Sequence, residues 1–101
     1  PNLTFEKPDT ETFRNLAFAY KALEKGGNMP CILNAANEEA VSSFLNDEIG
    51  FLEMSDVIEE CMHQVTFIQK PSYEEYVVTN NDARISAKEI IADCKKKKYV
   101  I

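Results

Sequence analysis

Cys61 and His63 are the one cysteine and histidine that lie close together in the sequence, so they are the first candidates for metal binding or nucleophilic catalysis. They are two positions apart, and on a helix such positions point to different sides. Cys31 and Cys94 form no C-x-x-C pair, so no zinc-binding spacing results. We therefore expect Cys61 to pack as a small hydrophobic residue and His63 to lie at the surface. We predict no catalytic, cofactor-binding or metal-ligating residue in this chain.

Carboxylates occur as neighbours, in Glu38-Glu39, Glu59-Glu60 and Glu74-Glu75. Adjacent residues on a helix do not converge on one point, so we expect solvated helix faces and not acid–base dyads. The lysine run at residues 95–98 is expected to be a solvated helix end. Contact of this run with a phosphate or an acidic partner is the alternative.

The most unusual local feature is the segment Leu33-Asn34-Ala35-Ala36-Asn37-Glu38. Its two asparagines are three positions apart, and Glu38 lies four beyond Asn34, so all three share one side of a helix. Asparagine carries both hydrogen-bond donors and acceptors. We expect these side chains to form a partly buried hydrogen-bond network, and the alternative is contact with a ligand.

The elements that must position these residues are helices. Apolar residues spaced by three and four predict main helices over residues 13–25, 30–46, 55–65 and 81–97, with an isolated helical turn over 72–78. Gly26-Gly27 should end the first helix, and Ser55 should cap the third. Turn-forming residues 79–82 should separate the isolated turn from the last helix. The stripe of the first helix that should face the core is Phe13, Leu16, Ala17, Tyr20 and Leu23.

Together these elements predict an all-α fold, a small four-helix bundle with a short extended N-terminal arm. The arm should cover residues 1–12 and the bundle residues 13–101. Within the arm, Leu3-Thr4-Phe5-Glu6 alternates apolar and polar residues. A single strand has no partner in so small a chain, so this segment is either the stub of a sheet completed elsewhere or a coil.

Composition limits the function further. The chain has 101 residues and a net charge of −6, which argues against binding to nucleic acid or to an anionic membrane surface. Its longest apolar run, Met29–Leu33, is too short to span a bilayer. An odd number of cysteines favours a reducing compartment. The chain does not begin with Met, which indicates processing or a fragment.

Several segments, in this order, carry a family resemblance: Leu3-Thr4-Phe5-Glu6-Lys7-Pro8-Asp9, Gly26-Gly27, Leu33–Glu38 and Asp82-Ala83-Arg84. They resemble the C-terminal part of the 1-deoxy-D-xylulose 5-phosphate reductoisomerase family, over nearly the whole chain. The sequence departs from the family pattern at Arg14-Asn15 and in the tail after Lys95.

The resemblance implies a parent enzyme that converts 1-deoxy-D-xylulose 5-phosphate to 2-C-methyl-D-erythritol 4-phosphate in non-mevalonate isoprenoid biosynthesis. NADPH and a divalent metal, Mg or Mn, would serve the parent and not this chain, which would be inactive alone. The partner of the bundle would be the catalytic domain of the same polypeptide, in a cytoplasmic homodimer. The resemblance implies a family signature at residues 33–38, and we interpret the signature as structural.

A second hypothesis is a stand-alone acidic helical module for protein–protein interaction. Its negative surface would select basic partners. The hypotheses differ in what precedes Pro1, because only the first requires a catalytic portion upstream.

Overall fold

The structure, a computed structural model, describes the backbone of residues 10–99 and the side chains of residues 14–96. This part of the chain folds into α1 (Thr10–Lys25), α2 (Met29–Leu45), α3 (Phe51–Gln64) and α4 (Tyr73–Tyr99), and it contains no strand. The predicted all-α, four-helix fold is confirmed. The predicted arm lies outside the described residues except for residues 10–12, which belong to the first turn of α1.

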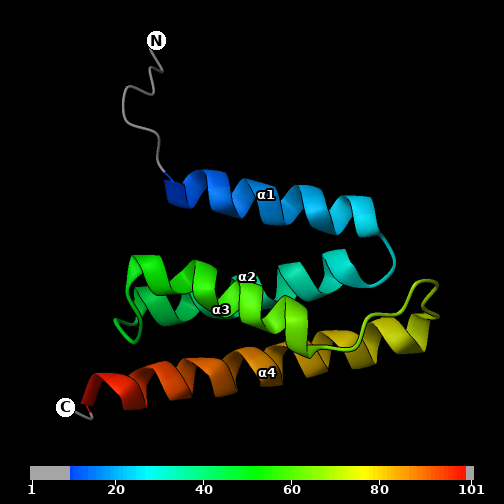
Figure 1. Ribbon diagram of the computed structural model, residues 1–101. Helices are drawn as coiled ribbons and strands as arrows, with labels where there is room; N and C mark the ends of the chain where they lie inside the picture. The colour runs from blue at the N-terminus through cyan, green and yellow to red at the C-terminus, as the bar shows by residue number, and fades with distance from the viewer. Residues whose placement is uncertain (1–9, 100–101) are drawn as a thin grey trace.

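Helices α2 and α3 form a central pair, and α1 and α4 lie on opposite sides of it (Figure 1). Helix α2 contacts the other three helices, whereas α1 and α4 do not contact each other within the described residues. The smallest extent of the molecule is only 19 Å. The core runs through the contacts of the central pair, and its fully buried residues include Ile32, Ala35, Ala36, Ala40, Val57, Cys61, Ala83 and Ala87.

Small side chains allow α2 to take this central place. Ala35, Ala36 and Ala40 have no exposed surface, and small residues let neighbouring helices approach closely. Pro30 stands in the first turn of α2, where its missing N–H is no loss. Helix α1 ends at Gly26-Gly27 as predicted, and both glycines adopt positive φ, 68° and 57°.

The predicted core stripe of α1 is wrong. Leu16, Tyr20 and Leu23 are 50%, 69% and 71% exposed, whereas the buried residues of α1 are Phe18 and Ala22. Helix α1 carries apolar residues on two different sides, and spacing alone cannot tell which side meets the core. The four described members of the predicted stripe, Leu16, Ala17, Tyr20 and Leu23, face outward.

Helix α3 begins at Phe51, a full turn before the predicted cap at Ser55. The actual cap lies at Gly50, whose backbone N–H donates to Glu53 Oε1 at 2.7 Å. Ser55 is buried inside the helix, and its hydroxyl donates to Asn15 Oδ1 of α1 at 2.9 Å. Ser55 therefore does not cap the helix, as its residue type suggested, because its hydroxyl bonds a distant residue instead.

Helix α4 is continuous, so the predicted interruption at residues 79–82 is also wrong. The hydroxyl of Thr79 is buried and accepts a hydrogen bond from Asn28, and Asn80 accepts one from Arg84. Such side chains favour turns when they compete for nearby backbone groups, and here they are occupied elsewhere. The capping box at Ser72 and Glu75 is confirmed, since each backbone N–H donates to the other residue's side chain, at 2.9 and 3.2 Å.

Candidate functional site

The signature segment, residues 33–38, lies in the middle of α2 and divides into an inner and an outer part. Ala35 and Ala36 are fully buried in the core, and Leu33 packs against the core from its edge. Asn34, Asn37 and Glu38 are exposed. The inner part is therefore packing material, and any further role of the segment belongs to its outer residues.

Glu38 has a specific partner on α4. The Arg84 guanidinium donates from Nη2 to Glu38 and from Nη1 to Glu39 Oε2, the latter at 3.1 Å, while its Nε donates to Asn80 at 3.1 Å. The hydrogen bonds that Arg84 donates to Glu38 and then to Glu39 raise the pKa of Arg84. Both carboxylates thus converge on one guanidinium, contrary to the expectation for adjacent residues. The result is an ionic clamp between α2 and α4.

A second clamp of the same design joins α1 to α3. Arg14 Nη2 lies 2.8 Å from Asp56 Oδ1 and 2.8 Å from Glu59 Oε1. Its hydrogen bonds to Glu59 and then Asp56 raise the pKa of Arg14. The guanidinium also lies over the ring of Phe18, 5.6 Å from its centroid. Carboxylates from two of the acidic pairs therefore join helices and do not merely face solvent.

Asn34 and Asn37 do not form the predicted, partly buried hydrogen-bond network, because both side chains are exposed. They line a shallow groove of about 420 Å³ between α1 and α2, together with Asn15, Phe18 and Leu33. Among the described side chains, no hydrogen bond joins either asparagine to another residue. Phe18 and Leu33 contribute apolar surface to this groove, and the three asparagines contribute amide groups.

The buried polar network of this fold is instead built on Asn28, which the sequence analysis did not identify. Asn28 has no exposed surface, and its Nδ2 donates to Thr66 O and to Thr79 Oγ1, each at 2.9 Å. Its Oδ1 accepts from the Ile68 N–H at 2.8 Å, and its own N–H donates to Ile68 O at 2.9 Å. The one sign of this role in the sequence was the position of Asn28, a polar residue directly after two glycines. The network fixes the connection between α3 and α4 against the start of α2.

Gly27 makes this attachment possible. A Cβ at Gly27 would stand 2.3 Å from the carbonyl oxygen of Ile68, whereas one at Gly26 would meet nothing within 4 Å. The close approach of two backbones, together with positive φ, requires glycine at position 27.

Cys61 and His63 lie where the sequence analysis predicts them, in the core and at the surface. Cys61 is fully buried and its Sγ–H donates to Ala83 O at 3.3 Å, and burial raises the pKa of its thiol. His63 is exposed. Over the described part of the chain, no three His, Cys, Asp or Glu side chains gather closely enough to hold a metal ion.

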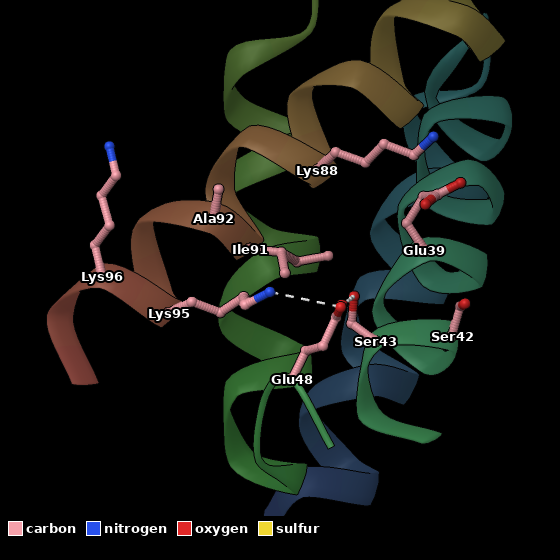
Figure 2. Close-up of a pocket in the computed structure, with 9 residues that line it drawn as sticks. All are labelled: Glu39, Ser42, Ser43, Glu48, Lys88, Ile91, Ala92, Lys95 and Lys96. Atoms are coloured by element: carbon pink, nitrogen blue, oxygen red, sulfur yellow. Dashed lines mark hydrogen bonds and ion pairs between the residues drawn. The ribbon is translucent and has the colours of Figure 1, made fainter. Parts of the chain in front are cut away.

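A larger groove of about 710 Å³ lies between α2 and the second half of α4 (Figure 2). Lys88, Lys95 and Lys96 stand on its α4 wall, and Lys95 Nζ lies 3.6 Å from Glu48 Oε2. Ser43 also donates to Glu48, at 3.0 Å. Across the groove from these lysines lie Glu39 of α2 and Glu48, which follows α2, so the groove has no single charge with which to select an anion.

No helix of the described chain is long and apolar enough to cross a bilayer.

Comparison with known proteins gives consistent results. The family model described as DXP reductoisomerase C-terminal domain matches residues 1–86. The 1-deoxy-D-xylulose 5-phosphate reductoisomerase of Bacteroides fragilis is 62% identical over 90 residues, which is 89% of this chain and 23% of the relative. That of Bacteroides thetaiotaomicron is 59% identical over the same shares.

A solved structure is also similar. The 1-deoxy-D-xylulose 5-phosphate reductoisomerase from Zymomonas mobilis in complex with NADPH aligns with a TM-score of 0.75 at 34% identity. The alignment covers 90% of this chain and 26% of that one. The chain therefore spans about a quarter of the length of the relatives it matches. Sequence and structure agree that this chain belongs to the DXP reductoisomerase C-terminal domain family.

Proposed function

We propose that this chain is the C-terminal structural domain of an enzyme that converts 1-deoxy-D-xylulose 5-phosphate to 2-C-methyl-D-erythritol 4-phosphate, in non-mevalonate isoprenoid biosynthesis. The family match over residues 1–86 supports this proposal, as does the likeness to a reductoisomerase solved with NADPH. The stand-alone interaction module is the less favoured function, because the relatives carry this sequence as about a quarter of a longer polypeptide.

One observation carries the structural role: the interior of the bundle and its signature segment are used for packing. Ala35 and Ala36 of the signature fill the core, and Glu38 joins α2 to α4 through Arg84. We therefore assign residues 33–38 a structural role in holding the central helix to its neighbours. Asn34 and Asn37 complete the outer surface of the same helix.

The cofactors of the proposed enzyme would be bound outside this chain. Several of the described acidic side chains are engaged by arginine or lysine, and the described His, Cys, Asp and Glu side chains form no group that could hold a metal ion. They do not fit a divalent ion such as Mg or Mn. We propose that the ion and NADPH are held by the catalytic domain of the same polypeptide, which residues 1–9 would join to the bundle.

We also propose a homodimeric, cytoplasmic parent enzyme. Cys31 and Cys61 are thiols, and Cys61 lies in the core. Cysteines usually stay as thiols in the reducing cytosol, which is consistent with the proposed location.

The test compares the full-length polypeptide with the 101-residue chain. With 1-deoxy-D-xylulose 5-phosphate and Mg²⁺ or Mn²⁺, the full-length protein should oxidise NADPH. The oxidation is measured as the loss of nicotinamide absorbance. The 101-residue chain should neither oxidise NADPH nor bind it in a fluorescence titration. Turnover or nucleotide binding by the 101-residue chain would refute the structural role, and an inactive full-length protein would refute the proposed reaction.

A further inference from the structure

The outer side of α1 carries an apolar stripe that nothing in the described structure covers. Leu16, Tyr20 and Leu23 are spaced by four and then three positions and are all at least half exposed. This spacing places them in one row along the helix, as in the seam between two packed helices. Apolar rows of this kind on a soluble protein usually mark an interaction surface.

Helix α1 is also the helix with the least internal support. Among its described side chains only Phe18 and Ala22 are buried, and Arg14 adds the ionic clamp to α3. It contacts α2 and α3 but not α4, and in Figure 1 it forms one outer edge of the molecule. One long side of α1 therefore has no neighbour among the described residues.

A second exposed apolar row lies at the start of α4, where Tyr73, Tyr76 and Val77 are spaced by three and four positions. Phe51, at the start of α3, already packs edge-on against Phe44, with ring centroids 6.0 Å apart. Of these two rows, the stripe on α1 is the one that directly follows residues 1–9 in the chain.

We infer that the outer stripe of α1, Leu16, Tyr20 and Leu23, is the surface on which the bundle docks against an apolar helical face of the polypeptide portion preceding Pro1. This inference rests on the proposed function, because it requires a longer polypeptide of which this chain is the C-terminal part. The occupant is thus a covalently joined neighbour and not a second copy of the bundle.

The position of the stripe in the chain supports this occupant. The chain covers 23% of its relatives and matches a C-terminal domain, so the larger portion precedes it. Helix α1 is the first described element after that portion. Residues 1–9 reach at most roughly 30 Å when extended, and Leu16 lies only about 9 Å along the helix axis from Thr10. A short connection keeps the two surfaces at an effective concentration of about the millimolar range.

The experiment uses the full-length polypeptide with a protease site inserted between Asp9 and Thr10. After cleavage, the docked bundle should stay with the preceding portion in gel filtration. Leu23→Glu places a charge in the stripe and should weaken the reassociation of the two cut parts at least about tenfold. Leu45→Glu is the matched control, because Leu45 also lies in the last turn of its helix and is 72% exposed against 71% for Leu23. It should change the affinity less than twofold.

Tyr20→Ser serves as a milder second variant and should also weaken reassociation, with circular dichroism confirming that each variant bundle stays helical. Separate elution of the wild-type parts after cleavage would overturn the inference. So would equal affinity of the Leu23→Glu and Leu45→Glu parts, or a dimer of the 101-residue chain that Leu23→Glu makes monomeric. The activity of the uncut polypeptide is measured in parallel, so that an inactive protein counts against the proposed reaction and not against the docking surface.

Discussion

Helices α1 and α4 flank the same central pair from opposite sides, but they are held in different ways. Helix α4 buries Ala83, Ala87 and Ile91 and adds hydrogen bonds to Asn28 and to the carboxylates of α2. The described part of α1 buries Phe18 and Ala22 alone and turns its longer apolar row to solvent. This difference indicates that α4 is an integral part of the core, whereas α1 is a boundary element whose outer side we expect the preceding portion of the polypeptide to cover.

The largest expected effect tests the attachment of α4 at its buried polar network. Asn28→Ala removes three side-chain hydrogen bonds and leaves the Ile68 N–H and Thr66 carbonyl without their partner. We expect the free energy of unfolding of the chain to fall by about 3 kcal/mol, since buried groups left unsatisfied are costly. Urea unfolding followed by circular dichroism measures this.

Asn37→Ala is the control for Asn28, because Asn37 is an exposed asparagine of α2, the helix that Asn28 directly precedes. Its free energy of unfolding should stay within about 0.5 kcal/mol of the wild type. Equal losses for the two variants would show that the Asn28 network does not hold α4.

A matched substitution on the two flanking helices tests the comparison directly. Ala83→Leu inserts a large side chain where α4 is fully buried and should cost about 1–3 kcal/mol. Ala17→Leu adds the same atoms to the exposed side of α1 and should change stability by less than about 0.5 kcal/mol. If Ala17→Leu were as destabilising as Ala83→Leu in urea unfolding, α1 would be packed as tightly as α4.

The ionic clamp between Arg84 of α4 and the carboxylates of α2 should contribute less to the free energy of unfolding than packing does. Arg84 is partly exposed, at 30% of its side chain, and so is Glu38, at 55%. Ion pairs at such exposure are worth roughly 0–1 kcal/mol, so Arg84→Met should destabilise the chain by about 1 kcal/mol at low salt. Unfolding in about 1 M NaCl, where screening is strong, should shrink the difference. A loss that grows with salt would contradict the ionic origin.

The smallest expected effect is a pH dependence from the thiol of Cys61. Burial raises the pKa of this thiol in the folded chain, so the folded state keeps a proton that the unfolded state releases above its ordinary pKa of about 8.5. Stability from this group is fully present below that pH and is lost as pH rises further. In urea unfolding between pH 7 and 10, Cys61→Ala should lose less stability over this range than the wild type. A parallel decline would exclude Cys61 as the cause.

The parts of the fold that depend on near neighbours were predictable from the sequence. The stop at Gly26-Gly27 and the capping box at Ser72 and Glu75 involve residues within one helical turn, so their types determine them. The start of α3 and the continuity of α4 were not predictable in this way. The hydroxyl of Ser55 bonds a residue 40 positions away, and that of Thr79 one 51 positions away. Spacing within the helix contains no information about such partners.

The candidate site shows the same limit. The signature at residues 33–38 was found from its residue types, and the burial of Ala35 and Ala36 agrees with a packing role. Its hydrogen bonds were not predictable, because Glu38 pairs with Arg84 from α4, 46 positions later. Asn28 belongs to no repeated pattern, so only the assembled fold distinguishes this asparagine from the exposed ones.

The Asn28 network also has a consequence for how the chain acquires its structure during synthesis. Its side-chain hydrogen bonds join Asn28 to residues 38, 40 and 51 positions later. Contacts across such long stretches require costly loop closure and therefore form late. A ribosome must make Thr79 before the Asn28 amide can acquire its last partner, so α1 and α2 emerge with this polar group still hydrated. A nascent chain stalled before Thr79 should therefore remain open to proteases over its first two helices.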